Sequence, residues 1–323
     1  MKKLVSVLLA TVMLFGVTAI AMAEGPSIGV CVYKFDDTFM TGVRNAITAA
    51  AEGICEAPIA DSQNAQPTQN DQVAMYVSQG VDALAINPVD RTACAEISKM
   101  AGDIPVVYFN REPIAEEMVD FDAWWYVGAK AEESGTMSGQ ILVDYFTANP
   151  TEDGVIYYAM LQGEPGHQDA ELRSIFSVKA LEDAGFTLVE VVKDTAMWDR
   201  PKAQDKMSAW LAAYDRIDAV LANNDDMALG AIEALKAEGY FSEGKFMPVV
   251  GVDATAPALE ALKEGTLLGT VLNDAVNQGR ATLLLAVAAA TGEFGDYPFD
   301  IVDDHYVWVP YQMVTEDNYT DFE

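Results

Sequence analysis

The feature of this sequence that most constrains its fold is a repeated alternation of short apolar runs with longer stretches of helical periodicity. The short runs are rich in Val, Ile and Leu, which is typical of strands buried on both faces. Short strands that alternate with amphipathic helices predict βαβ units and therefore parallel sheets. The predicted strands span residues 28–33, 54–60, 83–86, 105–109, 155–161, 188–192, 219–222, 249–252, 268–272 and 306–309.

The length and the course of this pattern predict two lobes. A chain of 323 residues is long enough for about two domains. The strand–helix alternation restarts after residues 125–128, and no low-complexity linker separates the two halves. We therefore predict an α/β protein with two Rossmann-like lobes of parallel sheet. Short crossings between compact lobes favour hinge closure over a ligand.

Polar and aromatic side chains collect just after the predicted strands, where the chain turns toward a helix. Ligands of open α/β sheets bind outside the carboxyl ends of the strands, so we expect these side chains to share one site. They include no nucleophile–base pair and no metal-ligand spacing, which favours a neutral, polyhydroxylated ligand. The candidate residues are Asp37, Phe39, Asn110, His167, Asp169, Arg173, Trp198, Asn224, Asp253 and Asn273.

Most of these residues also have a plain structural explanation when taken singly. Helix N-capping accounts for one polar residue in each of the clusters 36–38, 223–225 and 273–274. Asp169 and Arg173 are four apart on a predicted helix and could form a surface ion pair. Phe39 could pack in a core and Trp198 could cover a lobe surface. Two aromatic rings, one from each lobe, would instead pack against the C–H faces of a pyranose.

The first 23 residues predict a signal peptide. Lys2 and Lys3 precede an apolar run over residues 4–20, and Ala21-Met22-Ala23 provides a small-residue cleavage site. The alternative is a membrane anchor, but the run is short for a span. No Cys follows the run, so a lipid anchor is not indicated. We expect cleavage near Ala23 and export to the periplasm or the exterior.

Charge and cysteine content exclude several classes of partner and cofactor. The 50 acidic and 19 basic residues give a formal net charge of −31, which opposes binding to nucleic acid or to anionic membranes and also serves solubility. Cys31 lies in an apolar strand and is expected in the core. Cys55 and Cys94 could pair, and the sequence leaves this open. An odd number of cysteines without a Cys/His cluster argues against a zinc site.

The order and content of these motifs resemble the periplasmic galactose/glucose-binding proteins of sugar ABC transport and chemotaxis. These proteins are type 1 periplasmic binding proteins. The resemblance covers essentially the whole chain after residue 23. It is carried by residues 28–40, 61–64, 110–113, 163–173, 194–199, 222–225, 251–254 and 269–275.

The resemblance implies a role for each candidate residue and a discontinuous domain structure. Phe39 and Trp198 would sandwich the pyranose, and the other eight candidates would bind its hydroxyls. A three-segment hinge would cross near residues 127–128, 272–273 and 309–310. The N-terminal lobe would then comprise residues 24–128 plus 273–309, and the C-terminal lobe residues 129–272 plus 310–323.

One family feature is degenerate here. The family carries a calcium loop that resembles an EF-hand, and the corresponding segment spans residues 149–157. Asp153 is retained, but Asn149 and Thr151 are weaker oxygen donors, and Tyr157 replaces a side-chain amide. The distal carboxylate would come from Asp218, which is shorter than the Glu of the family. Calcium requires six or more oxygens, so we expect no calcium, or weak binding at most, and no other cofactor.

The function that follows is an extracytoplasmic receptor for D-galactose or D-glucose that is not an enzyme. By hinge closure it would deliver sugar to the membrane subunits of an ABC transporter, with a chemoreceptor as a second partner, and it would act as a monomer. Two alternatives stay open: a receptor for another monosaccharide that feeds a sensor kinase, and a glycoside-processing enzyme that uses paired carboxylates. A transcriptional regulator of the same architecture is opposed by the acidic charge and the signal peptide.

Overall fold

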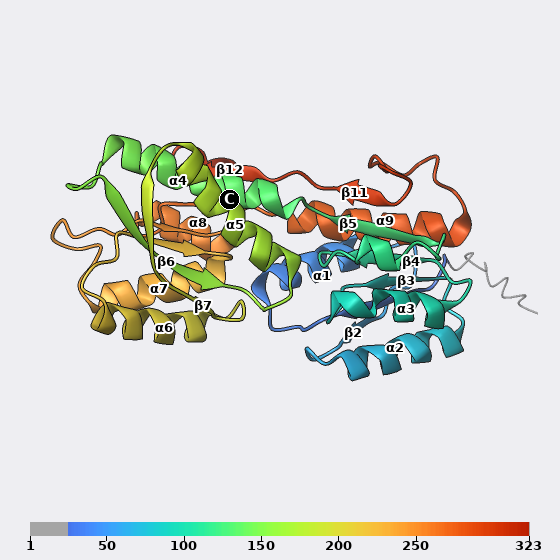
Figure 1. The fold of residues 1–323 in the computed structure, drawn as a ribbon. Coiled ribbons are helices and arrows are strands. Elements are labelled where there is room, and N and C mark those ends of the chain that lie inside the picture. The colour runs from blue at the N-terminus through green and yellow to red at the C-terminus, as the bar shows by residue number, and fades with distance from the viewer. Residues whose placement is uncertain (1–24, 323) are drawn as a thin grey trace, which may run out of the picture.

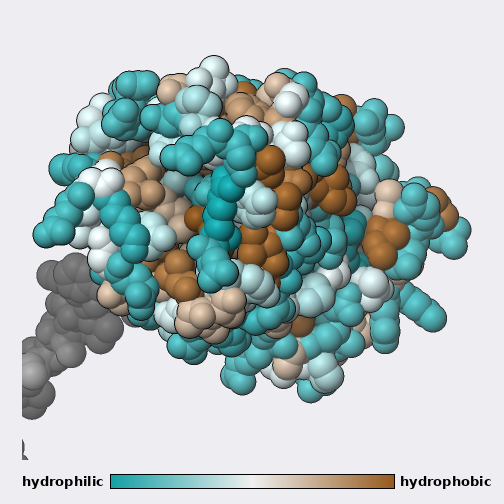
Figure 2. Space-filling model, turned by 60° about the vertical axis from the view of Figure 1, so that its left-hand side comes forward, coloured by the Kyte–Doolittle hydropathy of each residue, from teal (hydrophilic) through white to brown (hydrophobic). Residues whose placement is uncertain are grey.

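The computed structural model describes residues 25–322, so the predicted signal peptide lies outside the described residues. The chain forms two lobes side by side, each with a sheet and helices on both faces (Figure 1). No helix among residues 25–322 is both long enough and apolar enough to cross a membrane. The face shown in Figure 2 is mainly hydrophilic, with hydrophobic side chains scattered among polar ones, as the acidic composition leads one to expect.

The two sheets have equivalent strand orders. The first runs β11-β5-β4-β3-β1-β2 and the second β12-β10-β9-β8-β6-β7. All neighbours are parallel except β10 and β12, which are antiparallel. This confirms the predicted fold of two lobes with mainly parallel sheets. The first sheet contains β1 Ile28–Val32, β2 Ile59–Asp61, β3 Ala83–Ile86, β4 Val106–Phe109, β5 Trp124–Gly128 and β11 Tyr306–Trp308; the second contains β6 Val155–Gln162, β7 Thr187–Thr195, β8 Ala219–Ala222, β9 Val249–Val250, β10 Gly269–Leu272 and β12 Gln312–Thr315.

Helices connect the strands and cover the sheets. In the described chain the first lobe contains α1 Thr38–Ala51, α2 Gln66–Gln79, α3 Cys94–Ala101 and α9 Ala275–Thr291; the second contains α4 Ala131–Ala148, α5 Gln168–Asp183, α6 Arg200–Ala213, α7 Asp225–Ala237 and α8 Ala256–Lys263. Short 3-10 helices lie at Arg91–Ala93, Ala115–Glu117 and Tyr319–Asp321.

The chain passes between the two sheets three times. It leaves the first sheet after β5, returns after β10 to form α9 and β11, and leaves again for β12. In Figure 1 the orange and red α9 and β11 therefore lie among the blue and teal elements of the first lobe. Leu283 and Leu285 of α9 are fully buried in one cluster with Ile28 and Ile47, so the late segment is part of that core.

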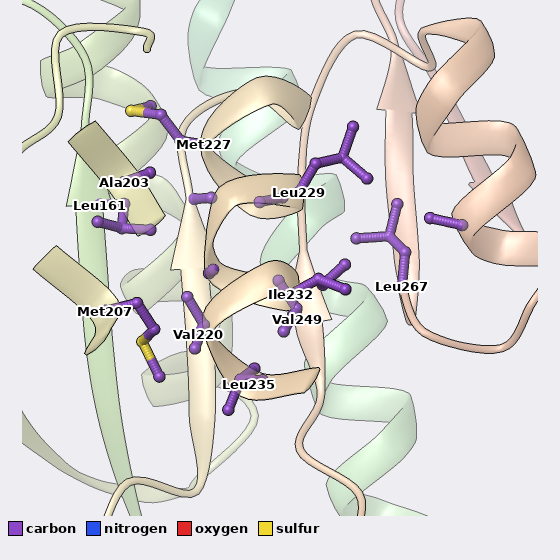
Figure 3. Close-up of a cluster of buried hydrophobic side chains, with 14 of the residues drawn as sticks. Leu161, Ala203, Met207, Val220, Met227, Leu229, Ile232, Leu235, Val249 and Leu267 are labelled. Carbon is purple, nitrogen blue, oxygen red and sulfur yellow. The ribbon is translucent and has the colours of Figure 1, made fainter. Parts of the chain in front are cut away.

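Each lobe contains two clusters of buried apolar side chains. In the second lobe Met207 of α6 and Ile232 of α7 pack against Val220 and Val249 of the sheet (Figure 3). These side chains are 0–2% exposed. Full burial of a side chain of this size contributes about 1.5–3 kcal/mol. The cores hold the sheets rigid, which fixes the loops at the carboxyl ends of the strands.

Several strands differ from the sequence-based expectation. Strand β2 begins at Ile59 rather than residue 54. Residues 52–54 form the turn that follows α1, and Pro58, which has no N–H to donate, separates an isolated bridge at Glu56 from the strand. Strands β5 and β12 are additional to the predicted set. Three of the five residues of β5 are aromatic rather than aliphatic, and only one residue of β12 is buried, so neither forms the aliphatic run that marked the other strands. Strand β7 continues to Thr195.

The three cysteines are free thiols. Cys31 and Cys94 are buried in one apolar cluster, whereas Cys55 is half-buried beside a different cluster. Burial raises the pKa of the Cys31 thiol to about 12, so this thiol is neutral and unreactive at neutral pH. The expectation of a core role for Cys31 is confirmed, and the open possibility of a bond between Cys55 and Cys94 is not realised.

Helices α4 and α5 pack closely at Gly139. A methyl group at this position would lie 2.3 Å from the carbonyl oxygen of Ser177, so α5 would have to shift. We predict that Gly139→Ala lowers the free energy of unfolding by about 1–3 kcal/mol, as overpacking does in other cores. Chemical denaturation would measure the change. Gly295→Ala is the control, because no atom lies within 4 Å of the added methyl group; equal stability of both variants would contradict the prediction.

Candidate ligand-binding site

All ten candidate residues line one cavity between the lobes, at the carboxyl ends of the strands. The cavity contains about 340 Å³ of empty space, part of which is open to solvent. Its first-lobe side follows β1 and β4, and its second-lobe side follows β6 to β10. The lining residues are Tyr33, Asp37, Phe39, Met40, Asn110, Arg111, His167, Asp169, Arg173, Trp198, Asn224, Asp253 and Asn273.

Three lining residues were not among the candidates: Tyr33, Met40 and Arg111. The Arg111 guanidinium lies 3.8 Å from the centre of the Tyr33 ring, and the Tyr33 hydroxyl donates to Asp37 Oδ2 at 2.6 Å. Tyr33 directly follows a strand and Arg111 directly follows Asn110. Their position at the ends of strands could have identified Tyr33 and Arg111 from the sequence, although neither residue belongs to a motif with a fixed spacing.

The two candidate aromatic rings come from opposite lobes. Phe39 is 9% exposed on α1 and also packs in the core of the first lobe, so its core explanation and a site role are both compatible with the structure. Trp198 is 8% exposed and meets the His167 ring edge-on, with centroids 5.1 Å apart. A methyl group at Gly163 would lie 2.0 Å from Trp198 Cζ2, so the indole occupies its place only because residue 163 is glycine.

Arg173 is the most connected polar group of the cavity. Its guanidinium donates to Asp169 Oδ2 at 2.9 Å and to the Tyr311 hydroxyl at 3.0 Å. It also donates to Ser134 Oγ at 3.2 Å and to the carbonyl oxygen of Asn223 at 2.9 Å. Four of the five N–H groups of this side chain therefore bond to protein atoms.

The ion pair between Asp169 and Arg173 lies inside the protein. The two side chains are 6% and 4% exposed, so the explanation as a surface pair is wrong. Asp169 Oδ1 is buried and has no hydrogen-bond partner within residues 25–322, and the same holds for Trp198 Nε1. A buried polar atom without a partner is costly. These two atoms are therefore positioned as an acceptor and a donor for a polar ligand.

Helix capping holds Asp37 and Asn224 in place. Asp37 Oδ1 accepts from Met40 N at 2.8 Å, and Asn224 Oδ1 accepts from Met227 N at 3.0 Å. The capping explanation is thus correct for both residues, and each still faces the cavity. In the third cluster the cap of α9 is Asp274, which leaves Asn273 to hydrogen-bond with Asp253 at 3.2 Å.

His167 caps α5 and is a neutral imidazole. Its Nδ1 accepts from the backbone N–H of Asp169 at 3.1 Å, which assigns the ring proton to Nε2. Burial, together with the charges of Arg111 and Arg173, holds the pKa of His167 well below its ordinary value. Burial also raises the pKa of Asp169 and of Asp253, although Arg173 opposes the shift in each.

Three candidates have unusual backbone conformations. Asn110, Trp198 and Asp253 have φ angles of 63°, 60° and 125°. Residues other than glycine rarely adopt positive φ, and such positions concentrate at ligand sites where the surrounding structure compensates for the strain. This strain sets the direction in which the three side chains leave the ends of β4, β7 and β9.

Direct contacts join the lobes at the edge of the cavity. Glu164 of the second lobe accepts from Arg111 Nη2 at 2.7 Å and from Asn64 Nδ2 at 3.1 Å, both in the first lobe. Gln168 Nε2 donates to the carbonyl oxygen of Asn110 at 3.4 Å. The Arg111 and Glu164 side chains are 6% and 11% exposed, so this interlobe ion pair is largely removed from water.

Comparison with known proteins identifies the family. Residues 28–294 match the periplasmic binding protein domain. The chain belongs to the periplasmic binding protein family. This confirms the resemblance inferred from the motifs, and the family implies a location outside the cytoplasm.

Individual relatives of this binding protein match it along nearly its whole length. The D-galactose/methyl-galactoside binding periplasmic protein MglB of Haemophilus influenzae is 41% identical over 318 residues, covering 95% of each chain. A putative rhizopine-binding protein of Rhizobium meliloti is 33% identical over 308 residues, covering 93% of this chain and 94% of that protein. The crystal structure of an ABC transporter solute binding protein from Bacillus halodurans with bound myo-inositol superimposes with a TM-score of 0.81, at 33% identity, and covers 94% of this chain and 99% of that chain.

The interlobe ion pair yields a prediction about closure of the binding protein. In the closed arrangement, Glu164→Ala leaves the Arg111 guanidinium buried without its carboxylate, which costs about 3–5 kcal/mol in comparable pairs. We therefore predict that the ligand-free variant opens, and that small-angle X-ray scattering gives a larger radius of gyration than for the unmodified protein. Glu171→Ala on the exposed side of α5 is the control. Identical scattering from Glu164→Ala and the unmodified protein would contradict the prediction.

Proposed function

We propose that this protein is an extracytoplasmic receptor for a monosaccharide, D-galactose or D-glucose, and that it delivers the sugar to an ABC transporter. The observation that carries the proposal is the pairing of Phe39 and Trp198 from opposite lobes across a cavity otherwise lined mainly by carboxylates, amides and other polar groups. A pyranose has apolar C–H faces and a rim of hydroxyls, and this arrangement suits both. The similarity to a galactose-binding protein supports the choice of sugar.

The polar groups of the cavity have the hydrogen-bonding character that sugar hydroxyls require. Asp169 Oδ1 is available to accept a hydrogen bond from a sugar hydroxyl, and His167 Nε2 and Trp198 Nε1 are available to donate one. A hydrogen bond from a hydroxyl to a charged carboxylate is short and strong, above all in a site that excludes water. We assign all ten candidates to sugar binding on this basis.

Closure of the lobes would convert binding into a signal. A ligand held by both lobes makes its full set of contacts only in the closed state, so it shifts the open–closed equilibrium toward closure. We propose the crossings near residues 127–128, 272–273 and 309–310 as the hinge, with the lobe boundaries predicted from the sequence. Membrane subunits of an ABC transporter would recognise the closed monomer, and a chemoreceptor is a second proposed partner.

A second candidate ligand is another ring polyol. The relative from Bacillus halodurans holds myo-inositol, which also presents hydroxyls around a six-membered ring. The glycoside-processing alternative is weaker, because the family and the relatives named above are binding proteins. Incubation with nitrophenyl hexosides should accordingly give no turnover.

A thermal-shift screen would test the class of ligand. A ligand that binds only the folded state stabilises it by about 4 kcal/mol at a concentration of 1,000 times Kd. We predict that D-galactose and D-glucose raise the melting temperature by several degrees, whereas D-ribose has little effect. A strong response to ribose alone would defeat the hexose proposal. A response to myo-inositol alone would replace the hexose with a cyclitol.

Substitution of the cavity residues would test the site itself. We predict that Asp37→Ala and Trp198→Ala each weaken sugar binding at least tenfold. In Asp37→Ala a buried sugar hydroxyl loses its hydrogen-bond partner, which costs about 1–3 kcal/mol of binding free energy, and in Trp198→Ala an apolar face of the sugar loses its aromatic contact. Isothermal titration calorimetry would measure both affinities. Asp36→Ala is a matched control, since its side chain is 85% exposed and does not line the cavity. Unchanged affinity in both variants would remove the site assignment.

A further inference from the structure

The strongest unexplained polar cluster lies at the far end of the second lobe from the cavity. Its centre is Arg216, which precedes β8, and its partners lie in the turn before β6 and at the amino ends of both strands. The ligand cavity lies at the opposite, carboxyl end of the same strands. The cluster is therefore outside the proposed sugar site and takes no part in sugar binding.

The Arg216 guanidinium joins the turn before β6 to the segment before β8. Arg216 donates from Nη1 and Nη2 to the two carboxylate oxygens of Asp153, at 2.7 Å and 3.1 Å. Its Nε lies 3.0 Å from both oxygens of Asp218, and Nη2 donates to the carbonyl oxygen of Val155 at 3.0 Å. Five oxygens thus surround a single positive group, as oxygens surround a metal ion.

The cation is also fixed in orientation. The Arg216 guanidinium carbon lies 4.2 Å from the centre of the Tyr157 ring, and the Tyr157 backbone N–H donates to Asp218 Oδ2 at 2.9 Å. A bidentate arginine on a carboxylate is a stronger and more directional contact than a single ion pair.

The same segment does not fit a bound calcium ion. Both carboxylates that calcium would need, Asp153 and Asp218, are bonded to Arg216. Tyr157 offers an aromatic face to the guanidinium, and the Asn149 side chain donates back to the carbonyl oxygen of Tyr145 at 3.0 Å. Within residues 25–322 no group of three or more His, Cys, Asp or Glu side chains is arranged to hold a metal ion.

We propose that Arg216 is a built-in cation that takes the place of a divalent metal in this turn. The guanidinium compensates the two carboxylates and ties residues 149–155 to the start of β8. The turn is therefore ordered without calcium, and the fold of the second lobe is insensitive to chelators. Loss of the guanidinium would leave Asp153 and Asp218 facing the same space without a counter-charge, and a divalent cation could then partly replace it.

The test compares calcium binding and stability in the full mature chain before and after removal of Arg216. In the unmodified protein we expect no saturable heat on titration of calcium chloride into chelator-treated protein, and the same melting temperature with EDTA as with calcium. In Arg216→Gln we expect the melting temperature to fall by about 2–4 °C. Millimolar calcium should restore part of this loss in the variant only.

Two further variants make the result specific. Arg200→Gln is a matched control in the same lobe, because Arg200 is similarly exposed and pairs with Asp226 at 3.0 Å and Glu233 at 3.8 Å. This variant should gain no response to calcium. Adding Asp153→Asn to Arg216→Gln should relieve the repulsion, raise the melting temperature above that of the single variant and abolish the calcium response.

Three outcomes would overturn the proposal. The first is sub-micromolar calcium binding by the unmodified protein. The second is a melting temperature of Arg216→Gln equal to that of the unmodified protein. The third is an equal gain of calcium response in Arg216→Gln and Arg200→Gln, which would indicate a general effect of surface charge.

Discussion

The cavity depends on the buried guanidinium of Arg173. Its hydrogen bonds reach Ser134 on α4, the carbonyl oxygen of Asn223 after β8, and Tyr311 in the last crossing between the lobes. These partners are far apart in sequence, so one side chain sets the relative positions of several loops. Burial of a charge is tolerated only when its hydrogen bonds are satisfied. The network therefore fixes the loops that carry the candidate residues before any ligand binds.

Much of the fold and of the cavity could be predicted from local sequence. Strand ends are marked by the change from apolar to polar residues, and parallel strands end at one edge, so residues such as Asn110 and Asn224 could be grouped from the sequence alone. Capping and a place in the cavity lining are compatible, since Asp37 Oδ1 caps α1 while the side chain still lines the cavity. Local sequence therefore predicted both the cap and the position at the cavity.

Contacts between distant segments could not be predicted. Arg111 and Glu164 pair across the lobes from positions 53 residues apart, and Arg216 reaches Asp153 over 63 residues. No local sequence pattern predicts such a long-range contact, because the contact depends on how the strands are ordered in the sheets. The positive φ angles at Trp198 and Asp253 could not be predicted from the sequence either, since neither residue type has a strong enough preference for that conformation. The edge strand β12 was not predicted, because only one of its four residues is buried.

Positive charge is scarce in this chain. The chain has only 19 Lys and Arg against 50 Asp and Glu, and three of its arginines lie at positions where carboxylates converge. Arg173 lies at the cavity and pairs with Asp169, and Arg111 lies between the lobes and pairs with Glu164. Arg216 lies at the opposite end of the second sheet, where it pairs with Asp153 and Asp218. An arginine presents a fixed fork of donors and cannot dissociate, whereas a metal ion can. The geometry at both ends of the second lobe is thus set by arginine side chains, which are part of the chain. The sugar is then the only proposed component that binds and dissociates.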